Sequence, residues 1–298
     1  MEILAIDVGG TVIKYALMNE KSEFIEKGSF PTPQDTIENF VESIGMIYDK
    51  YQERISGIAM SMPGRIDSER GYLYTGGALE YNSDKNIVEI LNKRCPKRIT
   101  VENDGKCAAL AEAWKGNLSD CDDGIVVILG TAIGGGIIKD KKLHKGKQFM
   151  AGELSFIITE NEIKNDESLD IFATQSGVPE LCRLVAESKN LKKEDVNGYV
   201  VFEYANNGDE KVLEILNEYC FKIAIQLHNL KYIYDPEKIA IGGGISKQDI
   251  LLEYIQKNIN IISKKLPYII AEPKIVRCRF DNDSNLIGAL SVYMTSMN

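Results

Sequence analysis

The run Ile3-Leu4-Ala5-Ile6-Asp7-Val8-Gly9-Gly10-Thr11 opens the chain with a short apolar strand pattern and a glycine turn. The same layout recurs twice: the apolar run 125–129 precedes Gly130 to Gly136, and the run 239–241 precedes Gly242-Gly243-Gly244. Glycine reaches positive φ and carries no Cβ, so such turns bring backbone N–H groups close to a phosphate. Three of them together predict a protein that holds the phosphates of a nucleotide.

The bulk composition is that of an ordinary globular protein of about two domains. The 298 residues are 44% hydrophobic and 27% charged, and 35 basic against 44 acidic residues give a net charge of −9. This acidic balance argues against a nucleic-acid partner, which would require a basic face. The sequence shows no charged leader and no apolar run near the ~20 residues of a membrane span, so we expect a cytoplasmic protein with no membrane partner.

The cysteines and histidines show no metal-binding spacing. No C-x-x-C pair occurs among the six cysteines, so a zinc ribbon or a redox pair has no support. The cysteines lie in apolar contexts and are expected to be buried free thiols. His228 lies in a helical pattern and is expected to be structural, whereas His144 lies in a basic hairpin pattern and should be at the surface.

Hydrophobic periodicity predicts an α/β protein. Residues 3–30 are typical of an antiparallel meander, followed by a helix that Thr32 caps with Pro33 at its first position. A long helical stripe covers 208–234 and ends at Asp235-Pro236.

The strand and glycine-turn layout of residues 3–18 recurs at 125–143. We therefore expect two α/β lobes with a ligand crevice between them. The first lobe is expected to comprise residues 1–117, completed by a C-terminal helix over 283–298, and the second to comprise 118–282.

The turn after the first strand is a candidate phosphate site. The N–H groups of Gly9 and Gly10 and the hydroxyl of Thr11 could meet β- and γ-phosphate oxygens, with Lys14 adding positive charge. Asp7 could orient Mg²⁺ through water, because Mg²⁺ keeps most of its water shell. A plain glycine-rich hairpin turn is the alternative. Neither a Walker A loop nor a dinucleotide fingerprint is present.

Glu102-Asn103-Asp104 ends a predicted strand and begins a predicted helix. A carboxylate there can accept a proton from a substrate hydroxyl, and phosphoryl transfer needs little more than this base, a held phosphate and charge neutralisation. The alternative is that Asp104 only caps the helix. Glu153 could accept hydrogen bonds from sugar hydroxyls, and Gly76-Gly77 could let a sugar approach the backbone; a surface charge and a simple turn are the alternatives.

Over about residues 2–290, the sequence resembles the ROK family (repressors, open reading frames, kinases) in the order of its motifs. These motifs are IDVGGT, SMPG, GGAL, VENDGKCAALAE, ILGTAIGGGII, AGELSF and IGGGIS. The resemblance implies a two-lobed actin-like ATPase (ribonuclease H-like) fold. It also implies ATP and Mg²⁺ bound between the lobes, phosphoryl transfer to a sugar hydroxyl, and a homodimer. The stretch TGGALEYN looks most like the β-glucoside kinase branch, with N-acetylmannosamine kinases close behind.

Matched residue by residue, the resemblance makes Asp104 the catalytic base. The positions expected at the sugar, from the motifs and the resemblance together, are Gly76, Gly77, Asn103, Glu153 and Asp170. The positions expected at the nucleotide are Asp7, Gly9, Gly10, Thr11 and Lys14 in the first loop, Gly130, Thr131 and Gly134 in the second, and Gly242, Gly243 and Gly244 on the adenosine side.

Four departures from the family pattern stand out. Phe156 occupies the position of a zinc-binding histidine and no cysteine cluster follows, so we expect no zinc site. Ala132 replaces a glycine and must take negative φ or accept strain. Gly105-Lys106 places a flexible residue and a cation where Ala-Asn is usual. Asp170 stands in for a sugar-binding glutamate and is one methylene shorter.

Two other functions remain open. A ROK-type transcriptional regulator would need a helix-turn-helix before the first strand, which begins at residue 2. A sugar sensor that binds without phosphorylating is suggested by Ala132 and Lys106.

Overall fold

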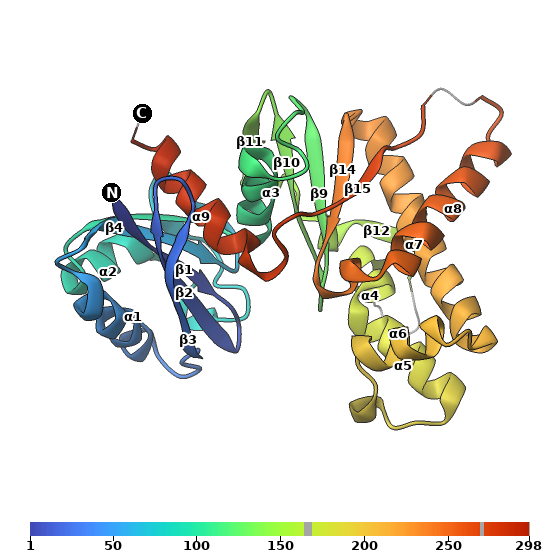
Figure 1. The fold of residues 1–298 in the computed structure, drawn as a ribbon, viewed down its shortest axis with the longest axis horizontal. Coiled ribbons are helices and arrows are strands. Elements are labelled where there is room, and N and C mark those ends of the chain that lie inside the picture. Colours follow the sequence, from blue (N-terminus) through green and yellow to red (C-terminus); the bar gives the residue numbers. More distant parts are fainter. Residues whose placement is uncertain (164–168, 269–270, 298) are drawn as a thin grey trace. The chain divides into compact units, whose positions relative to one another are not determined.

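The computed structural model describes residues 1–163, 169–268 and 271–297 (Figure 1). The chain divides into two compact units, each with its own hydrophobic core. Unit 1 comprises Met1–Lys115, Lys142–Ala151 and Asp283–Asn298, and unit 2 comprises Gly116–Lys141 and Gly152–Asn282. The short segment 142–151 therefore groups with unit 1, whereas the sequence pattern put it in the second lobe.

The sheet of unit 1 has the strand order β3-β2-β1-β4-β8. Its strands are β1 (Glu2–Val8), β2 (Val12–Asn19), β3 (Phe24–Pro31), β4 (Ile55–Met62) and β8 (Arg98–Asn103). The first three pair antiparallel, which confirms the meander, and β4 and β8 then extend the sheet parallel to β1. Three short strands, β5 (Ile66–Asp67), β6 (Tyr72–Leu73) and β7 (Lys85–Asn86), form a separate small sheet.

Helix α1 (Ile37–Tyr51) begins later than the sequence pattern predicted. The side-chain oxygen of Thr36 accepts a hydrogen bond from the Asn39 N–H at 3.2 Å, so Thr36 is the N-cap. The predicted cap at Thr32, with Pro33 at the first helical position, is wrong. The Thr32 hydroxyl instead donates to the Gly9 carbonyl at 2.7 Å, which ties the end of β3 to the first glycine turn.

The other helices of unit 1 are α2 (Ile87–Arg94), α3 (Asp104–Lys115) and α9 (Ser284–Thr295), with the 3₁₀ turns η1 (Glu80–Asn82) and η5 (Asp281–Asp283) nearby in sequence. Helix α9 packs on α3, and the expected C-terminal helix is thus confirmed. At the crossing, a Cβ on Gly288 would lie only 1.8 Å from the Cys107 carbonyl oxygen. Glycine at this position is what lets the two helices approach so closely.

The main sheet of unit 2 repeats the plan of unit 1. Its strands β9 (Gly124–Leu129), β10 (Ile133–Lys139), β14 (Lys238–Gly242) and β15 (Ile275–Arg277) run in the order β10-β9-β14-β15. The first pair is antiparallel and the others are parallel, as in β2-β1-β4-β8. The repeated layout predicted from the glycine turns is confirmed. Strands β12 (Ile158–Ile163) and β13 (Leu169–Ile171) pair separately. Strand β11 (Lys142–His144) begins the segment 142–151, which groups with unit 1.

Helices dominate the rest of unit 2 (Figure 1). They are α4 (Phe172–Ser176), α5 (Val178–Lys189), α6 (Gly198–Asn206), α7 (Glu210–Tyr234) and α8 (Asp249–Lys265), with the 3₁₀ turns η2 (Leu154–Phe156), η3 (Lys193–Asp195) and η4 (Gly244–Lys247). The long stripe predicted over 208–234 is confirmed as α7, which Asp209 caps. The helix stops at Asp235, where φ is 54°, directly before Pro236.

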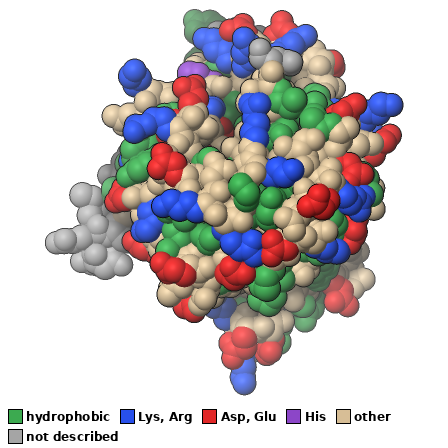
Figure 2. All heavy atoms as spheres, turned by 90° about the vertical axis from the view of Figure 1, so that its left-hand side faces the viewer, with side chains coloured by type: hydrophobic (Ala, Val, Ile, Leu, Met, Phe, Trp, Pro, Cys, Tyr) green, Lys and Arg blue, Asp and Glu red, His purple; other side chains and the backbone are tan. Residues whose placement is uncertain are grey.

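The cysteines and His144 agree with the sequence expectations. All six cysteines are buried free thiols, and His144 is exposed. Within the described ranges, no helix combines the length and apolarity that crossing a membrane requires. On the face drawn in Figure 2, Lys and Arg side chains are interspersed with Asp and Glu. That face therefore carries no extended basic patch.

Candidate functional site

The carboxyl ends of three parallel strands bring the candidate residues of unit 1 together. Asp7 on β1 lies opposite Ser61 on β4, and Ser61 lies opposite Glu102 on β8. Such strand ends are where open α/β sheets bind ligands. Asp7, which ends the first apolar run, and Asp104, which follows the third of these strands, thus lie at the same edge of the sheet.

Asp7 is buried, with 7% of its surface exposed. Burial raises the pKa of its carboxyl; hydrogen bonds from Asn285 and Ser61 and the nearby Lys14 ammonium oppose the shift. Ser61 Oγ donates to Asp7 Oδ1 at 3.1 Å and Asn285 Nδ2 donates to the same oxygen at 3.0 Å. Both hydrogen bonds use Oδ1, so Oδ2 carries neither of them.

This arrangement fits the second-sphere magnesium role expected of Asp7. Mg²⁺ is a hard cation that takes oxygen ligands and is usually held by one or two carboxylates, water and substrate phosphates. In the described part of the chain, no group of three or more His, Cys, Asp or Glu side chains is suited to hold a metal. A magnesium ion here would therefore depend on the nucleotide as well as on Asp7.

The first glycine turn directs the N–H groups of Gly10 and Thr11, but not that of Gly9, to one side. The Gly9 N–H donates to the Val12 carbonyl at 3.1 Å within the turn, so the expectation that it meets a phosphate oxygen is wrong. The Gly9 carbonyl accepts from Thr32 Oγ1 at 2.7 Å, and the Gly10 carbonyl accepts from Gln34 Nε2 at 2.6 Å. In a trans peptide, C=O and the following N–H point in opposite directions. The N–H groups of Gly10 and Thr11 therefore point away from residues 32–34. Lys14 lies opposite Asp7 in the β1–β2 register.

Asn103, and not Asp104, caps helix α3. Asn103 Oδ1 accepts from the backbone N–H of Lys106 at 3.1 Å, which is the geometry of an N-cap. Asp104 is the first helical residue, and its Oδ1 accepts from the Gly105 N–H at 2.8 Å and from Asn103 Nδ2 at 3.0 Å. The capping function that could have explained Asp104 without catalysis is thus filled by its neighbour.

Two glycine turns pack against this junction. Asn103 Nδ2 also donates to the Gly64 carbonyl at 3.0 Å. Gly64 has φ +103° and Gly77 has φ +57°, and a Cβ on Gly77 would lie 3.1 Å from the Gly64 nitrogen. A Cβ on Gly10 would lie 3.2 Å from Ala78 Cβ. The Gly76-Gly77 turn therefore lies between the first glycine turn and Asn103.

The second glycine turn, in unit 2, connects β9 to β10. The Gly130 N–H donates to the Ala132 carbonyl at 3.1 Å, and the Gly130 carbonyl accepts from the Val178 N–H at 2.9 Å. Thr131 and Ala132 are exposed, and Gly134 continues the turn into β10. Ala132 is not among the described residues with positive φ, so the alanine at this position is free of left-handed strain.

The third glycine turn follows β14 and lies beside the second. Gly242 pairs with Ile128 of β9. Gly243 has φ +94°, and a Cβ there would lie 2.1 Å from the Leu129 carbonyl oxygen. A Cβ added to Gly244 would have no atom within 4 Å. The two turns of unit 2 thus share one edge of its sheet.

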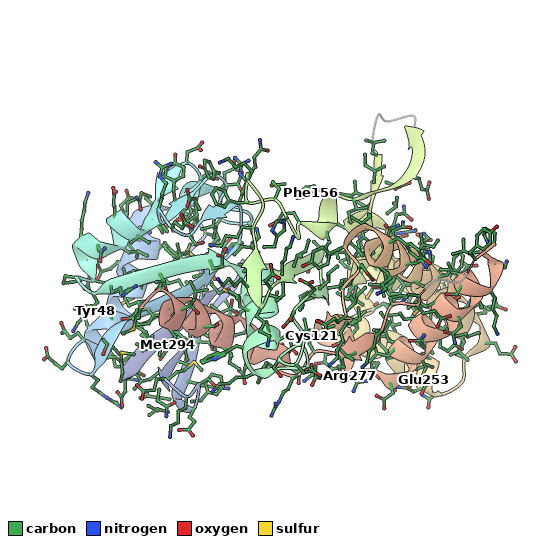
Figure 3. All side chains as sticks on the ribbon, turned by 90° about the horizontal axis from the view of Figure 1, so that it is seen from above. Tyr48, Cys121, Phe156, Glu253, Arg277 and Met294 are labelled. Atoms are coloured by element: carbon green, nitrogen blue, oxygen red, sulfur yellow. The ribbon has the colours of Figure 1, made fainter. Side chains whose placement is uncertain are left out.

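The remaining candidates of unit 2 lie after β10. Glu153 is half-buried at the start of η2, and a Cβ on Gly152 would lie 2.9 Å from the Gly136 Cα. Asp170 on β13 is buried, with 5% of its surface exposed. Phe156, labelled in Figure 3, is 64% exposed at the position where a family histidine would lie.

The structure groups the predicted residues by unit. Unit 1 holds Asp7, Gly9, Gly10, Thr11, Lys14, Gly76, Gly77, Asn103 and Asp104, and unit 2 holds Gly130, Thr131, Gly134, Glu153, Asp170, Gly242, Gly243 and Gly244. Sequence reasoning missed Ser61 and Asn285, the two donors to Asp7. The end of a parallel strand was a signal for Ser61, but nothing local marked Asn285.

Known proteins resemble this chain over nearly its whole length. The ROK family pattern matches residues 3–295. A β-glucoside kinase of Listeria monocytogenes is 26% identical over 298 residues, covering 100% of this chain and 99% of its own.

Solved structures show the same fold. A ROK family protein from Streptococcus pneumoniae in complex with sucrose has a TM-score of 0.89 and 26% identity, covering 100% of this chain and 99% of that one. A ROK family glucokinase from Streptomyces griseus, solved with glucose and AMPPNP, has a TM-score of 0.83 and 21% identity, covering 98% and 99%. The predicted two-lobed actin-like ATPase fold is confirmed, and the chain belongs to the ROK family.

Proposed function

We propose that this sugar kinase transfers the γ-phosphoryl group of ATP to a hydroxyl of a sugar or β-glucoside, with Asp104 as the general base. The observation that supports the proposal most directly is that Asn103 and Asp104 have different roles at the start of α3. Asn103 caps the helix, and Asp104 is held by hydrogen bonds on Oδ1 beside the glycine turns. A half-buried carboxylate oriented in this way is suited to accept the proton of a hydroxyl as it attacks phosphorus.

The donor is proposed to be ATP with Mg²⁺. In support, the N–H groups of Gly10 and Thr11 point to one side of their turn, and Asp7 offers a carboxylate with one oxygen outside its two hydrogen bonds. When bound, Mg²⁺ would neutralise charge on the phosphates. The Streptomyces griseus relative was solved with an ATP analogue. In unit 2, Gly130, Thr131 and Gly134 would bind phosphate, and Gly242 to Gly244 would lie at the adenosine. ATP as the donor would place the reaction in the cytoplasm.

The acceptor is proposed to be a glucose-type sugar, and a β-glucoside is the first candidate because of the Listeria relative. Asn103, Glu153 and Asp170 would be the polar partners of the sugar, with the Gly76-Gly77 turn allowing its close approach. N-acetylmannosamine and glucose are the alternatives within the same chemistry. A sensor that binds sugar without turnover is the alternative outside it.

A panel assay tests the proposal. ADP release and the phosphorylated sugar are measured for glucose, cellobiose, an aryl β-glucoside, N-acetylmannosamine and fructose, with ATP and with or without Mg²⁺. We expect a phosphorylated product for at least one of these sugars and none when EDTA removes Mg²⁺. Direct binding of a sugar with no turnover on any member of the panel would establish the sensor instead.

The protein partner is proposed to be a second copy of this chain. The resemblance to ROK kinases supports a homodimer, and so do exposed apolar side chains of α7. Phe221, in the middle of the helix, and Tyr232 and Ile233, near its end, are 39%, 49% and 79% exposed. Light scattering should give twice the 33.3 kDa chain mass. A monomer at assay concentrations would contradict the homodimer without affecting the kinase proposal.

A further inference from the structure

Glu102 belongs to the Glu102-Asn103-Asp104 motif but has no role in the proposed function. Its side chain is only 1% exposed, and Lys145 Nζ lies 3.2 Å from its Oε2. Ser68 Oγ donates to the same oxygen at 2.8 Å and accepts a hydrogen bond from Lys145 Nζ. Glu102 Oε1 accepts from the Asn103 N–H at 2.9 Å. Both oxygens of this buried carboxylate are thus held, one by an ion pair and a hydroxyl and the other by the backbone of the next residue.

Asn103 connects this buried ion pair to Asp104. Its Nδ2 donates to Asp104 Oδ1 and to the Gly64 carbonyl, both at 3.0 Å, and its Oδ1 caps helix α3. The side-chain amide of Asn103 is therefore fixed on both its nitrogen and its oxygen. A continuous series of contacts leads from Lys145 through Glu102 and Asn103 to the carboxylate of Asp104.

The stability of the fold does not by itself require charges at this position. Neutral side chains of similar volume in place of a buried ion pair often leave a protein as stable or more stable. Glu102→Gln combined with Lys145→Met would keep about the same volume and an acceptor for the Asn103 N–H. The carboxylate differs in that it accepts this N–H in a charge-assisted hydrogen bond, which is shorter and roughly twice as strong as a neutral one. The ion pair thus makes the junction between β8 and α3 more rigid.

We propose that Lys145 and Glu102 are positioning residues for Asp104, which they hold in place through Asn103. A general base must lie within hydrogen-bond reach of the proton that it accepts, and a small misplacement lowers the rate. Lys145 and Glu102 therefore set kcat and leave the binding of ATP and sugar to other groups. The proposal rests on the proposed function, because Asp104 is taken as the general base there.

Two single variants test the role of the Lys145 cation. Lys145→Met removes the charge and keeps the volume. It should lower kcat about 10-fold, because a misplacement of about 1 Å can cost up to about 10²-fold. The KM values for sugar and ATP should stay within about threefold of wild type. Lys145→Arg keeps a cation and should have a kcat within about threefold of wild type. An unchanged kcat in Lys145→Met would overturn the proposal.

The double variant Glu102→Gln/Lys145→Met separates positioning from loss of stability. Lys145→Met alone leaves a buried carboxylate without its cation, so its Tm should fall by about 5–10 °C. The double variant has no charge at either position, and its Tm should return to within about 3 °C of wild type. Its kcat should remain about 10-fold low, because a neutral amide holds the Asn103 N–H less firmly. A double variant that regained wild-type kcat together with wild-type Tm would refute the positioning role.

A second ion pair, in unit 2, provides the matched control. Lys189 Nζ forms an ion pair with Asp209, and Asp209 Oδ1 accepts from the Val212 N–H at 3.2 Å. This pair therefore also combines a lysine, a carboxylate and a backbone N–H. Lys189→Met combined with Asp209→Asn removes the charges and keeps a good N-cap for α7. Its kcat should match that of wild type. An equal loss of kcat in this control would show that the Lys145 effect is not specific.

Amide hydrogen exchange, followed by NMR without ATP or sugar, keeps the two proposals distinguishable. The Asn103 N–H is bonded to Glu102, and the Gly105 N–H is bonded to Asp104 Oδ1. Both amides should exchange about 3- to 10-fold faster in the double variant than in wild type. If wild type phosphorylates no sugar of the panel, the proposed function fails, and these rates still decide whether the ion pair holds the junction. Unchanged exchange of both amides would overturn the positioning role whether or not the protein is a kinase.

Discussion

Asn285 on the C-terminal helix α9 donates its Nδ2 to Oδ1 of Asp7 at 3.0 Å, across 278 positions of the chain. Asp7 ends the first strand and is buried, so this amide and Ser61 supply the hydrogen bonds that water would otherwise provide. Helix α9, the last helix, thus supplies a hydrogen-bond donor to the carboxylate of Asp7 on the first strand.

Substitution of Asn285 by Ala should therefore destabilise the protein. Asp7 loses one of two donors in a buried position, and an unsatisfied buried group costs about 1–3 kcal/mol. The free energy of unfolding is measured in urea at neutral pH without nucleotide. Asn260→Ala, at an exposed position of α8, is the control and should change it by less than about 0.5 kcal/mol. Equal unfolding free energies for the two variants would contradict the prediction.

Asp7→Asn should have a higher free energy of unfolding than wild type at neutral pH, and it should lose kinase activity. Burial raises the folded-state pKa of Asp7 above its ordinary 3.8. Between these two pKa values the folded state binds more protons than the unfolded state, so wild-type stability falls as pH rises through this window. The amide removes this penalty. The stability difference should be largest above the window and vanish below pH 3.8, in urea titrations at several pH values. A less stable Asp7→Asn at neutral pH would refute this account.

Local sequence patterns predicted much of the fold. The apolar runs before Gly9, Gly130 and Gly242 all proved to be strands that end at glycine turns, because strand formation and glycine φ are determined within a few residues. The stripe of α7 and its stop at Asp235-Pro236 were likewise readable. Asp104 could be singled out because a carboxylate followed a strand and opened a helix.

Long-range contacts were beyond such patterns. Thr32 and Thr36 both precede the first helix and both suit an N-cap, and only the contact of Thr32 with Gly9 decides between them. Asn285 sits in an ordinary helical stretch, and its contact with Asp7 depends on how α9 packs on the sheet. The bond from Lys106 to Phe149 joins residues 43 positions apart. These contacts follow from tertiary packing, which the hydrophobic periodicity of a sequence does not predict.

Asp104→Asn should lower kcat by about 10²- to 10⁴-fold, the usual contribution of a general base, while the Kd for sugar changes little. The amide has nearly the same shape and can still accept the hydrogen bonds from Gly105 and Asn103 on its oxygen. The rate is measured as phosphorylated sugar at saturating ATP. Asp122→Asn, at a side chain that is 70% exposed in unit 2, is the control and should match wild type. A kcat for Asp104→Asn within threefold of wild type would remove Asp104 from the base role.

Two adjacent glycines of the third turn should respond in opposite directions to alanine. Gly243 has φ +94°, and its added Cβ would lie 2.1 Å from the Leu129 carbonyl oxygen, so Gly243→Ala combines left-handed strain with a backbone clash. We expect a loss of at least about 2 kcal/mol in unfolding free energy. Gly244 has negative φ and nothing within 4 Å of its Cβ position, so Gly244→Ala should gain about 0.4–1 kcal/mol by restricting the unfolded chain. Urea unfolding without nucleotide measures both. Equal destabilisation of both variants would contradict this prediction. It would mean that the close approach of Gly243 to the end of β9 is not the reason for glycine in this turn.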